Sequence, residues 1–161
     1  MRSAVTLICF AAAMGAASRC GAADFRLVGG SADWVHVVDL SSIDVTPSET
    51  RQVTVYTSAT SPMYSPFNGK LAKDVSWTWL INCATGQTRF KELVAYGENF
   101  DVVDDISPTD TPWLTPSRDQ ELGAHLGVYC SDSPSADRQM RRIRASDWRS
   151  ALSAAQSWIK R

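Results

Sequence analysis

The chain has 161 residues, with 16 Lys and Arg against 17 Asp and Glu, a formal net charge of -1 and 44% hydrophobic residues. This length and hydrophobicity fit one folded domain and exclude wholesale disorder. The near-neutral charge gives no case for nucleic-acid binding, and 9 Gly and 7 Pro exclude collagen-like and proline-rich chains.

The first residues have the pattern of a secretory signal peptide. Arg2 precedes the apolar run 4–14, and small residues follow it. The run is shorter than the roughly 20 residues that cross a bilayer, so no membrane span is predicted. We expect a signal peptide over 1–23, cleaved after Ala23; cleavage after Ser18 is the alternative. Cys20 would suit a lipidated protein, but Arg19 stands where a small residue is expected. The mature chain is therefore predicted to be exported, to the periplasm, the cell surface or the medium.

Signal cleavage leaves two of the four cysteines, Cys83 and Cys130. An even pair in an exported chain is most simply a disulfide. A redox or nucleophilic role is the alternative, but neither cysteine lies in a C-x-x-C motif or near a histidine in the sequence.

Alternating apolar and polar residues predict strands along most of the chain. In 75–83, Val75, Trp77 and Trp79 share one face with Cys83, and this strand forms a hairpin with 88–96. The long segment 58–73, with Pro62 and Pro66, is predicted to be a loop. The further predicted strands are 34–40, 43–45, 51–57 and 100–106.

A helix is predicted from Ser117, with a capping box, to Cys130 on its buried side. Gly123 and Gly127 are expected to allow close approach of this helix to the sheet. The polar segment 133–145 is predicted to be a linker, and Ser146 to begin a basic amphipathic helix over 146–161. The fold class predicted is α+β, with an antiparallel sheet of about five or six strands and a helix tethered to one face.

The charge is unevenly distributed along the chain. Residues 24–130 carry a net charge of -7, and residues 131–161 carry +4. The basic C-terminal helix could therefore make a weak contact with an anionic lipid surface or dock on the acidic domain. Docking on the acidic domain is favoured, because that surface is always adjacent.

Several segments, in this order and spacing, resemble the surface-adhesin protein E family of Gram-negative bacteria. They are Val37-Val38-Asp39 with Ser42-Ile43, Leu80 to Ala84 followed by Arg89, Tyr96-Gly97, and Trp113 to Pro116 before Cys130. The resemblance covers roughly 33–132 and defines a predicted adhesin domain over 24–132. It implies a twisted antiparallel sheet with a disulfide-tethered helix, and a surface-exposed protein that binds host matrix or serum proteins.

In the family, binding is attributed partly to basic residues before the cysteine strand, and here the segment 67–73 has two separated lysines and no arginine pair. We therefore expect a protein-binding module whose partner contacts are Lys70, Lys73, Arg89 and Lys91. A periplasmic envelope or stress-related binding protein is the alternative. An enzyme using His36 or His125 with an acidic residue is less favoured, since no catalytic motif is present.

No cofactor and no metal are predicted. The acidic residues of 98–110 do not have the spacing of an EF-hand loop. Trp77, Trp79 and Trp113 are expected to pack in the core.

Overall fold

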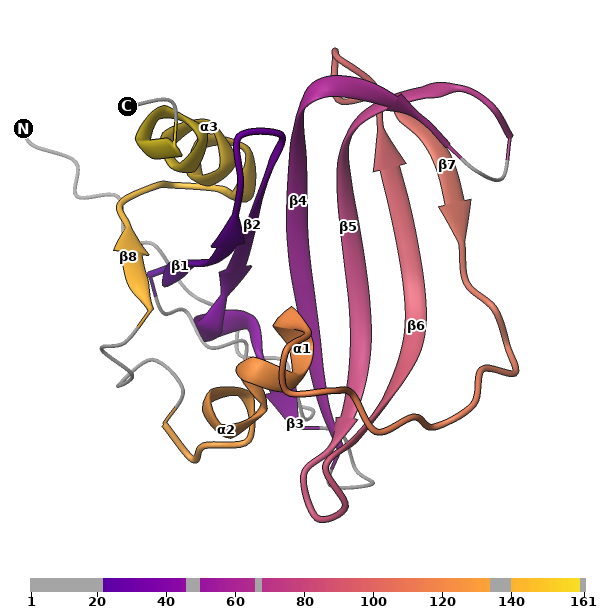
Figure 1. Cartoon of the computed structure of the whole chain (residues 1–161), viewed down its shortest axis with the longest axis vertical. Helices are drawn as coiled ribbons and strands as arrows, with labels where there is room; N and C mark the ends of the chain where they lie inside the picture. The colour runs from indigo at the N-terminus through magenta and orange to yellow at the C-terminus, as the bar shows by residue number, and fades with distance from the viewer. Residues whose placement is uncertain (1–21, 46–49, 66–67, 134–139, 160–161) are drawn as a thin grey trace, which may run out of the picture.

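The structure is a computed structural model that describes residues 22–45, 50–65, 68–133 and 140–159 (Figure 1). The predicted signal peptide lies almost entirely outside these residues and stays a prediction. Within the described part, no helix is long and apolar enough to cross a membrane.

The strands are β1 (Phe25–Gly30), β2 (Trp34–Asp39), β3 (Asp44–Val45), β4 (Thr50–Tyr64), β5 (Leu71–Asn82), β6 (Gln87–Tyr96), β7 (Val102–Ile106) and β8 (Arg141–Ile143). The helices are η1 (Leu40–Ser42), α1 (Glu121–Ala124), α2 (Leu126–Tyr129) and α3 (Trp148–Ile159).

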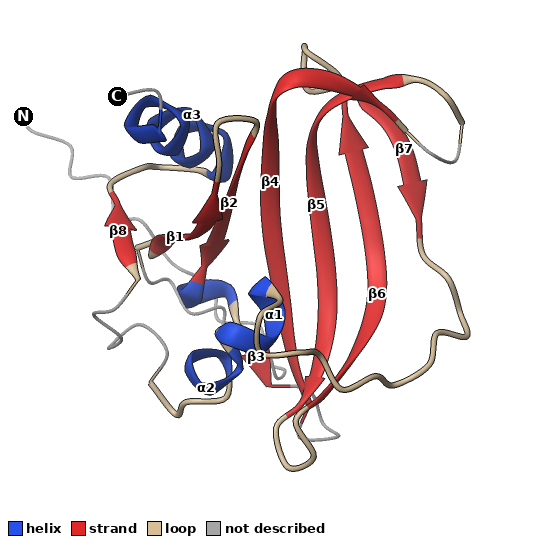
Figure 2. Cartoon of the chain, in the orientation of Figure 1, coloured by secondary structure: helices blue, strands red, loops and turns tan. Residues whose placement is uncertain are grey.

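The strands form one antiparallel sheet in the order β7-β6-β5-β4-β2-β1-β8, with β3 paired to β4 (Figure 2). The α+β class is therefore confirmed, as is the hairpin of β5 and β6. The sheet is larger than five or six strands because β1 and β8 extend it. A register shift between Leu27 and Gly29 interrupts the alternation of β1, and β8 has only three residues. Neither strand has a pattern that sequence periodicity detects.

Two segments predicted to be irregular contain strand. β4 continues to Tyr64, across much of the predicted loop 58–73, and its pairing with β5 is interrupted between Ser58 and Met63. This irregularity accommodates Pro62, because proline has no backbone N–H and an unpaired residue does not have to donate a hydrogen bond to the neighbouring strand. Likewise, β8 lies inside the predicted linker 133–145 and pairs with β1.

The two faces of the sheet carry separate apolar clusters. One face packs Val38, Val53 and Ile81 against Tyr129 of α2. Cys83 follows β5 on this face and forms a disulfide with Cys130 at the end of α2, with 5.5 Å between the Cα atoms. The predicted tether of the helical segment to the strand is thus confirmed.

The predicted helix 117–130 is instead two short helices separated at His125. Gln120 takes the N-cap position of α1, so the helix begins at Glu121 and not at Ser117. A Cβ at Gly123 would lie 2.0 Å from the carbonyl oxygen of Ser117, whereas one at Gly127 would meet nothing within 4 Å. Close approach at Gly123 is therefore to the preceding turn and not to the sheet.

On the other face of the sheet, α3 covers β1, β2 and β4. Ala151, Leu152 and Ala155 are buried with Phe25, Val35, Val37 and Ile143. Trp148 stacks on Tyr56 at 5.2 Å between ring centroids. Asp147, not Ser146, caps the helix by accepting a hydrogen bond from the Ser150 N–H at 2.8 Å. The C-terminal helix therefore docks on the strands, the arrangement favoured from the sequence.

Candidate binding groove

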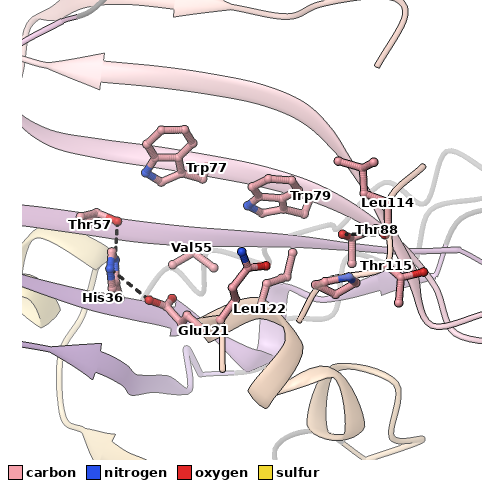
Figure 3. A pocket seen from close by; sticks show the side chains of 12 residues that line it. His36, Val55, Thr57, Trp77, Trp79, Thr88, Leu114, Thr115, Glu121 and Leu122 are labelled. Atoms are coloured by element: carbon pink, nitrogen blue, oxygen red, sulfur yellow. Dashed lines mark hydrogen bonds and ion pairs between the residues drawn. The ribbon is translucent and has the colours of Figure 1, made fainter. Parts of the chain in front are cut away.

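A groove of about 690 Å³ lies between the sheet and α1 (Figure 3). Its floor is Val55 of β4 with Trp77 and Trp79 of β5. The segment Leu114–Pro116 and Thr88 close one end, and His36 and Thr57 lie at the other. Gln120, Glu121 and Leu122 form the wall on the helical side. The groove is mostly apolar, with a few polar groups among its lining residues, which is the usual make-up of a ligand site.

Trp77 and Trp79 point into this groove from alternate positions of β5. Both indoles are half-buried and touch Phe90 of β6, with ring centroids 6.2 and 5.4 Å away. Strand parity predicts the correct face for both indoles, but the prediction that they are core residues is wrong. The helical segment covers only the part of this face nearest the disulfide, so the indoles keep an exposed side. Trp113 is half-buried beneath the guanidinium of Arg89 at 5.4 Å.

A hydrogen-bonded chain of polar side chains crosses the groove at its β2 end. His36 Nδ1 lies 2.6 Å from Thr57 Oγ1, and His36 Nε2 lies 3.0 Å from Glu121 Oε2. Burial lowers the pKa of His36 to about 4 and raises that of Glu121 to about 7. The imidazole is therefore neutral at neutral pH, so one of its ring nitrogens donates a hydrogen bond and the other accepts one.

A bulge in β1 positions Glu121. The register shift makes Val28 an extra residue, and His125 Nε2 lies 3.0 Å from the Val28 carbonyl oxygen that the bulge presents. Next to it, a Cβ at Gly29 would lie 3.3 Å from Glu121 Oε2 and 3.6 Å from the His36 ring. Glycine at this position and the contact of His125 together bring the start of α1 close enough to reach His36.

A second, smaller hollow of about 380 Å³ adjoins the groove and shares His36 and Thr57 with it. It lies between Trp34, Ala59 and Met63, near the far end of β4. Along β5 the two hollows extend from Trp79 to the position of Ala72, which pairs with Met63, a run of roughly 23 Å at about 3.3 Å per residue. The site is thus an elongated channel and not an isolated pit.

The hydrogen-bonded chain resembles a hydrolase triad, with Thr57 as nucleophile, His36 as base and Glu121 as acid. The surroundings of these residues do not suit hydrolysis. Thr57 is buried in a strand that is paired on both sides, so the neighbouring backbone N–H groups belong to the ladder and cannot form an oxyanion hole. A histidine with a pKa near 4 is also a weak general base at neutral pH. The arrangement suits recognition better than acyl transfer.

The four predicted contact residues do not form one patch. Lys73 shares the strand parity of Trp77, whereas Lys91 hydrogen-bonds Gln52 at 2.5 Å on the other face. Arg89 pairs with Leu80, which lies roughly 23 Å along β5 from Lys73 at about 3.3 Å per residue. Lys70 is exposed in the turn before β5. None of these side chains lines the groove.

Asp104 accepts a hydrogen bond from the Ser65 hydroxyl at 2.5 Å. Among the described residues, no three His, Cys, Asp or Glu side chains are placed to hold a metal ion.

Sequence reasoning identified His36 but not its partners. Glu121 is distant in the chain and reaches His36 only through the β1 bulge and the disulfide-tethered segment. The one available signal was the position of Glu121 in the first turn of the helix predicted from Ser117, directly after an extended segment.

No family model matches the chain, and no curated protein matches it by sequence. Among solved structures, a crystal structure of protein E from non-typeable Haemophilus influenzae is 17% identical, with a TM-score of 0.51, covering 90% of this chain and 95% of that one. Another structure of Haemophilus influenzae protein E is also 17% identical, with a TM-score of 0.48 and coverage of 77% and 96%. At this identity the likeness shows one thing: the chain has a protein E-like fold.

Proposed function

We propose that the protein is an exported binding protein and that the groove over Trp77 and Trp79 receives an extended segment of a protein partner. The groove itself carries this proposal. Half-exposed tryptophans in a hollow are typical anchor sites of protein interfaces, where aromatic residues supply much of the binding energy. The protein E-like fold and the sequence resemblance to surface adhesins support the same class of function.

The dimensions of the site favour an extended polypeptide. A strand-like segment advances about 3.3 Å per residue, so the two adjoining hollows accommodate roughly seven residues. Alternate side chains of such a segment would point toward the tryptophans and toward the hollow at Trp34. The intervening side chains would face solvent, which leaves His36, Thr57 and Gln120 to contact the partner's polar groups.

A matched pair of surface variants tests this proposal. Leu114, 61% exposed, lies on the groove rim, and Val102, 59% exposed, lies on β7 away from it. Peptides selected from a random displayed library against the wild-type protein should bind Leu114→Asp at least tenfold more weakly. Their affinity for Val102→Asp should be unchanged. Equal binding to both variants, with both folded by thermal denaturation, would show that the groove is not the binding site.

The four basic residues stay a separate proposal. Because they lie on different faces, we propose that they attract an acidic partner over a distance and do not form one contact. Replacing Lys70, Lys73, Arg89 and Lys91 by alanine should then slow association at low salt and leave dissociation unchanged. An equal loss at high salt would instead indicate direct contacts.

Export is supported by the disulfide, because such bonds persist mainly in oxidising compartments. Cell fractionation combined with protease treatment of intact cells would locate the native protein. Cleavage on intact cells is expected for a surface adhesin. Protection until the outer membrane is opened would favour the alternative, a periplasmic protein with a bacterial partner.

A further inference from the structure

Among its described lining residues, the groove has one acidic side chain and no Lys or Arg. The carboxylate is Glu121, whose side chain is 25% exposed. The adjoining hollow adds Asp33 and again no Lys or Arg. An elongated site with this lining is complementary to a positive charge on its ligand.

We propose that Glu121 binds an arginine side chain of the partner's extended segment, with the faces of Trp77 and Trp79 beside it. This assignment rests on the function proposed above and specifies the chemistry that the groove selects. The segment would place apolar residues on either side of the arginine, toward Leu114 and toward Trp34.

The contacts of Glu121 leave capacity for such a ligand. Its ion-pair distance of 3.0 Å is to His36, a neutral side chain that can offer a single N–H. When ionised, the carboxylate has about four lone-pair sites, so one donor leaves most of them free. A bound guanidinium favours this ionised form, because an opposite charge nearby lowers the pKa that burial raises. The ordinary partner for a half-buried carboxylate is a charged donor, because charge-assisted hydrogen bonds are roughly twice as strong as neutral ones.

The two tryptophans favour arginine over lysine. A guanidinium is planar and weakly hydrated, so it stacks on indole rings and still donates two hydrogen bonds to a carboxylate. The chain uses this contact elsewhere: Arg141 lies 3.6 Å from the centroid of Trp158, and Arg149 lies 4.5 Å from that of Phe100. The groove supplies the aromatic surface and the carboxylate, but its described lining residues include no Lys or Arg. The ligand would supply the cation.

Three synthetic peptides test the assignment without altering the protein. Each has nine residues, blocked ends and alternating Leu and Thr, with arginine, citrulline or glutamate at the centre. Citrulline keeps the shape of arginine but is neutral. Titration calorimetry with the full mature protein should show the arginine peptide binding about tenfold or more tightly than the citrulline peptide, the glutamate peptide binding weakest. A charge-assisted hydrogen bond predicts a difference of this size.

Two variants place the selectivity at Glu121. Glu121→Gln keeps the shape of the side chain but removes its charge and replaces one acceptor oxygen by an NH2 donor, so it should bind the arginine and citrulline peptides equally. Glu98→Gln, at an exposed position outside both hollows, is the matched control and should keep the wild-type preference.

The outcomes separate the two proposals. Equal wild-type binding of the three peptides would overturn the arginine assignment and indicate a neutral, apolar occupant, while leaving the groove as a binding site. A preference for arginine that survives in Glu121→Gln would also overturn it. Binding by none of the peptides, together with unchanged affinity of library-selected peptides in Leu114→Asp, would overturn the groove proposal as well.

Discussion

Gly123 shows how one missing side chain sets the position of α1. The hydrogen of its Cα faces the Ser117 carbonyl oxygen, and a Cβ there would approach it to 2.0 Å. Because the contact is with backbone, the turn before α1 must shift to relieve it. We expect Gly123→Ala to destabilise the fold by about 1–3 kcal/mol, as overpacking does.

Gly127 provides the matched comparison, since a Cβ there meets nothing within 4 Å. Gly127→Ala should be neutral or stabilise by up to about 1 kcal/mol through helix propensity. Urea denaturation of both variants measures the difference. Equal effects would mean that the turn at Ser117 can move freely.

The His36 and Glu121 pair should make stability depend on pH in two opposite ways. The pKa of Glu121 is about 7 when folded against an ordinary 4.5, so its contribution is present below 4.5 and lost as pH rises to 7. The pKa of His36 is about 4 against an ordinary 6.5, so its contribution is present above 6.5 and lost as pH falls to 4. Between about 4.5 and 6.5 the two trends oppose each other.

Single variants separate these trends. Relative to wild type, Glu121→Gln should gain stability as pH rises from about 4.5 to 7. His36→Gln should gain relative stability as pH falls from about 6.5 to 4. Urea denaturation across this range is the measurement, with Glu98→Gln as the control for removing a surface carboxylate. A constant difference for both groove variants would contradict the burial of the pair.

At the scale of elements, the disulfide holds the two short helices against the sheet. Neither α1 nor α2 exceeds four residues, so helix propensity alone cannot maintain them. The bond closes a sequence separation of 47 residues, worth about 4 kcal/mol on the chain-entropy model. We expect Cys83→Ser with Cys130→Ser to lose about this much in urea denaturation.

The same double variant should weaken peptide binding, because α1 supplies the groove wall with Glu121. Added reductant should have the same effect on the wild-type protein and none on the variant. Retention of full affinity after reduction would show that packing of Tyr129 and Leu122 suffices to hold the wall.

Parity explains which elements the sequence predicts well. In β5 and β6 the alternation of apolar and polar residues is nearly continuous. It therefore predicts the hairpin, the sheet face of Trp77 and Trp79, and the inward direction of Cys83. The break at His125 does not, because it arises from the contact of His125 with Val28, far away in the chain. The groove depends on the same long-range contact, so its position could not be predicted, although His36 stands out in the sequence as one of two histidines.

For the whole molecule, the opposite charges of domain and tail are less important than apolar packing. Arg142 lies 3.2 Å from Asp24, but it is largely exposed, and exposed ion pairs contribute little. The larger contribution comes from the buried side of α3, where Leu152 is 3% exposed among β1 and β2 residues. The tail therefore covers one face of the sheet as part of its core.

This arrangement predicts the effect of removing or altering the tail. A chain ending at Asp132 loses β8 and α3 and exposes Phe25, Val35 and Val37, so it should be strongly destabilised or aggregate.

Leu152→Ala is the milder test and should lower the free energy of unfolding by about 2–5 kcal/mol, as truncation of a buried leucine does. The neighbouring Ser153 faces solvent, so Ser153→Ala should change the free energy of unfolding by less than about 0.5 kcal/mol. Thermal and urea denaturation compare the three proteins with wild type. Full stability of the shortened chain would mean that α3 is a dispensable cover, with its apolar side available for another surface.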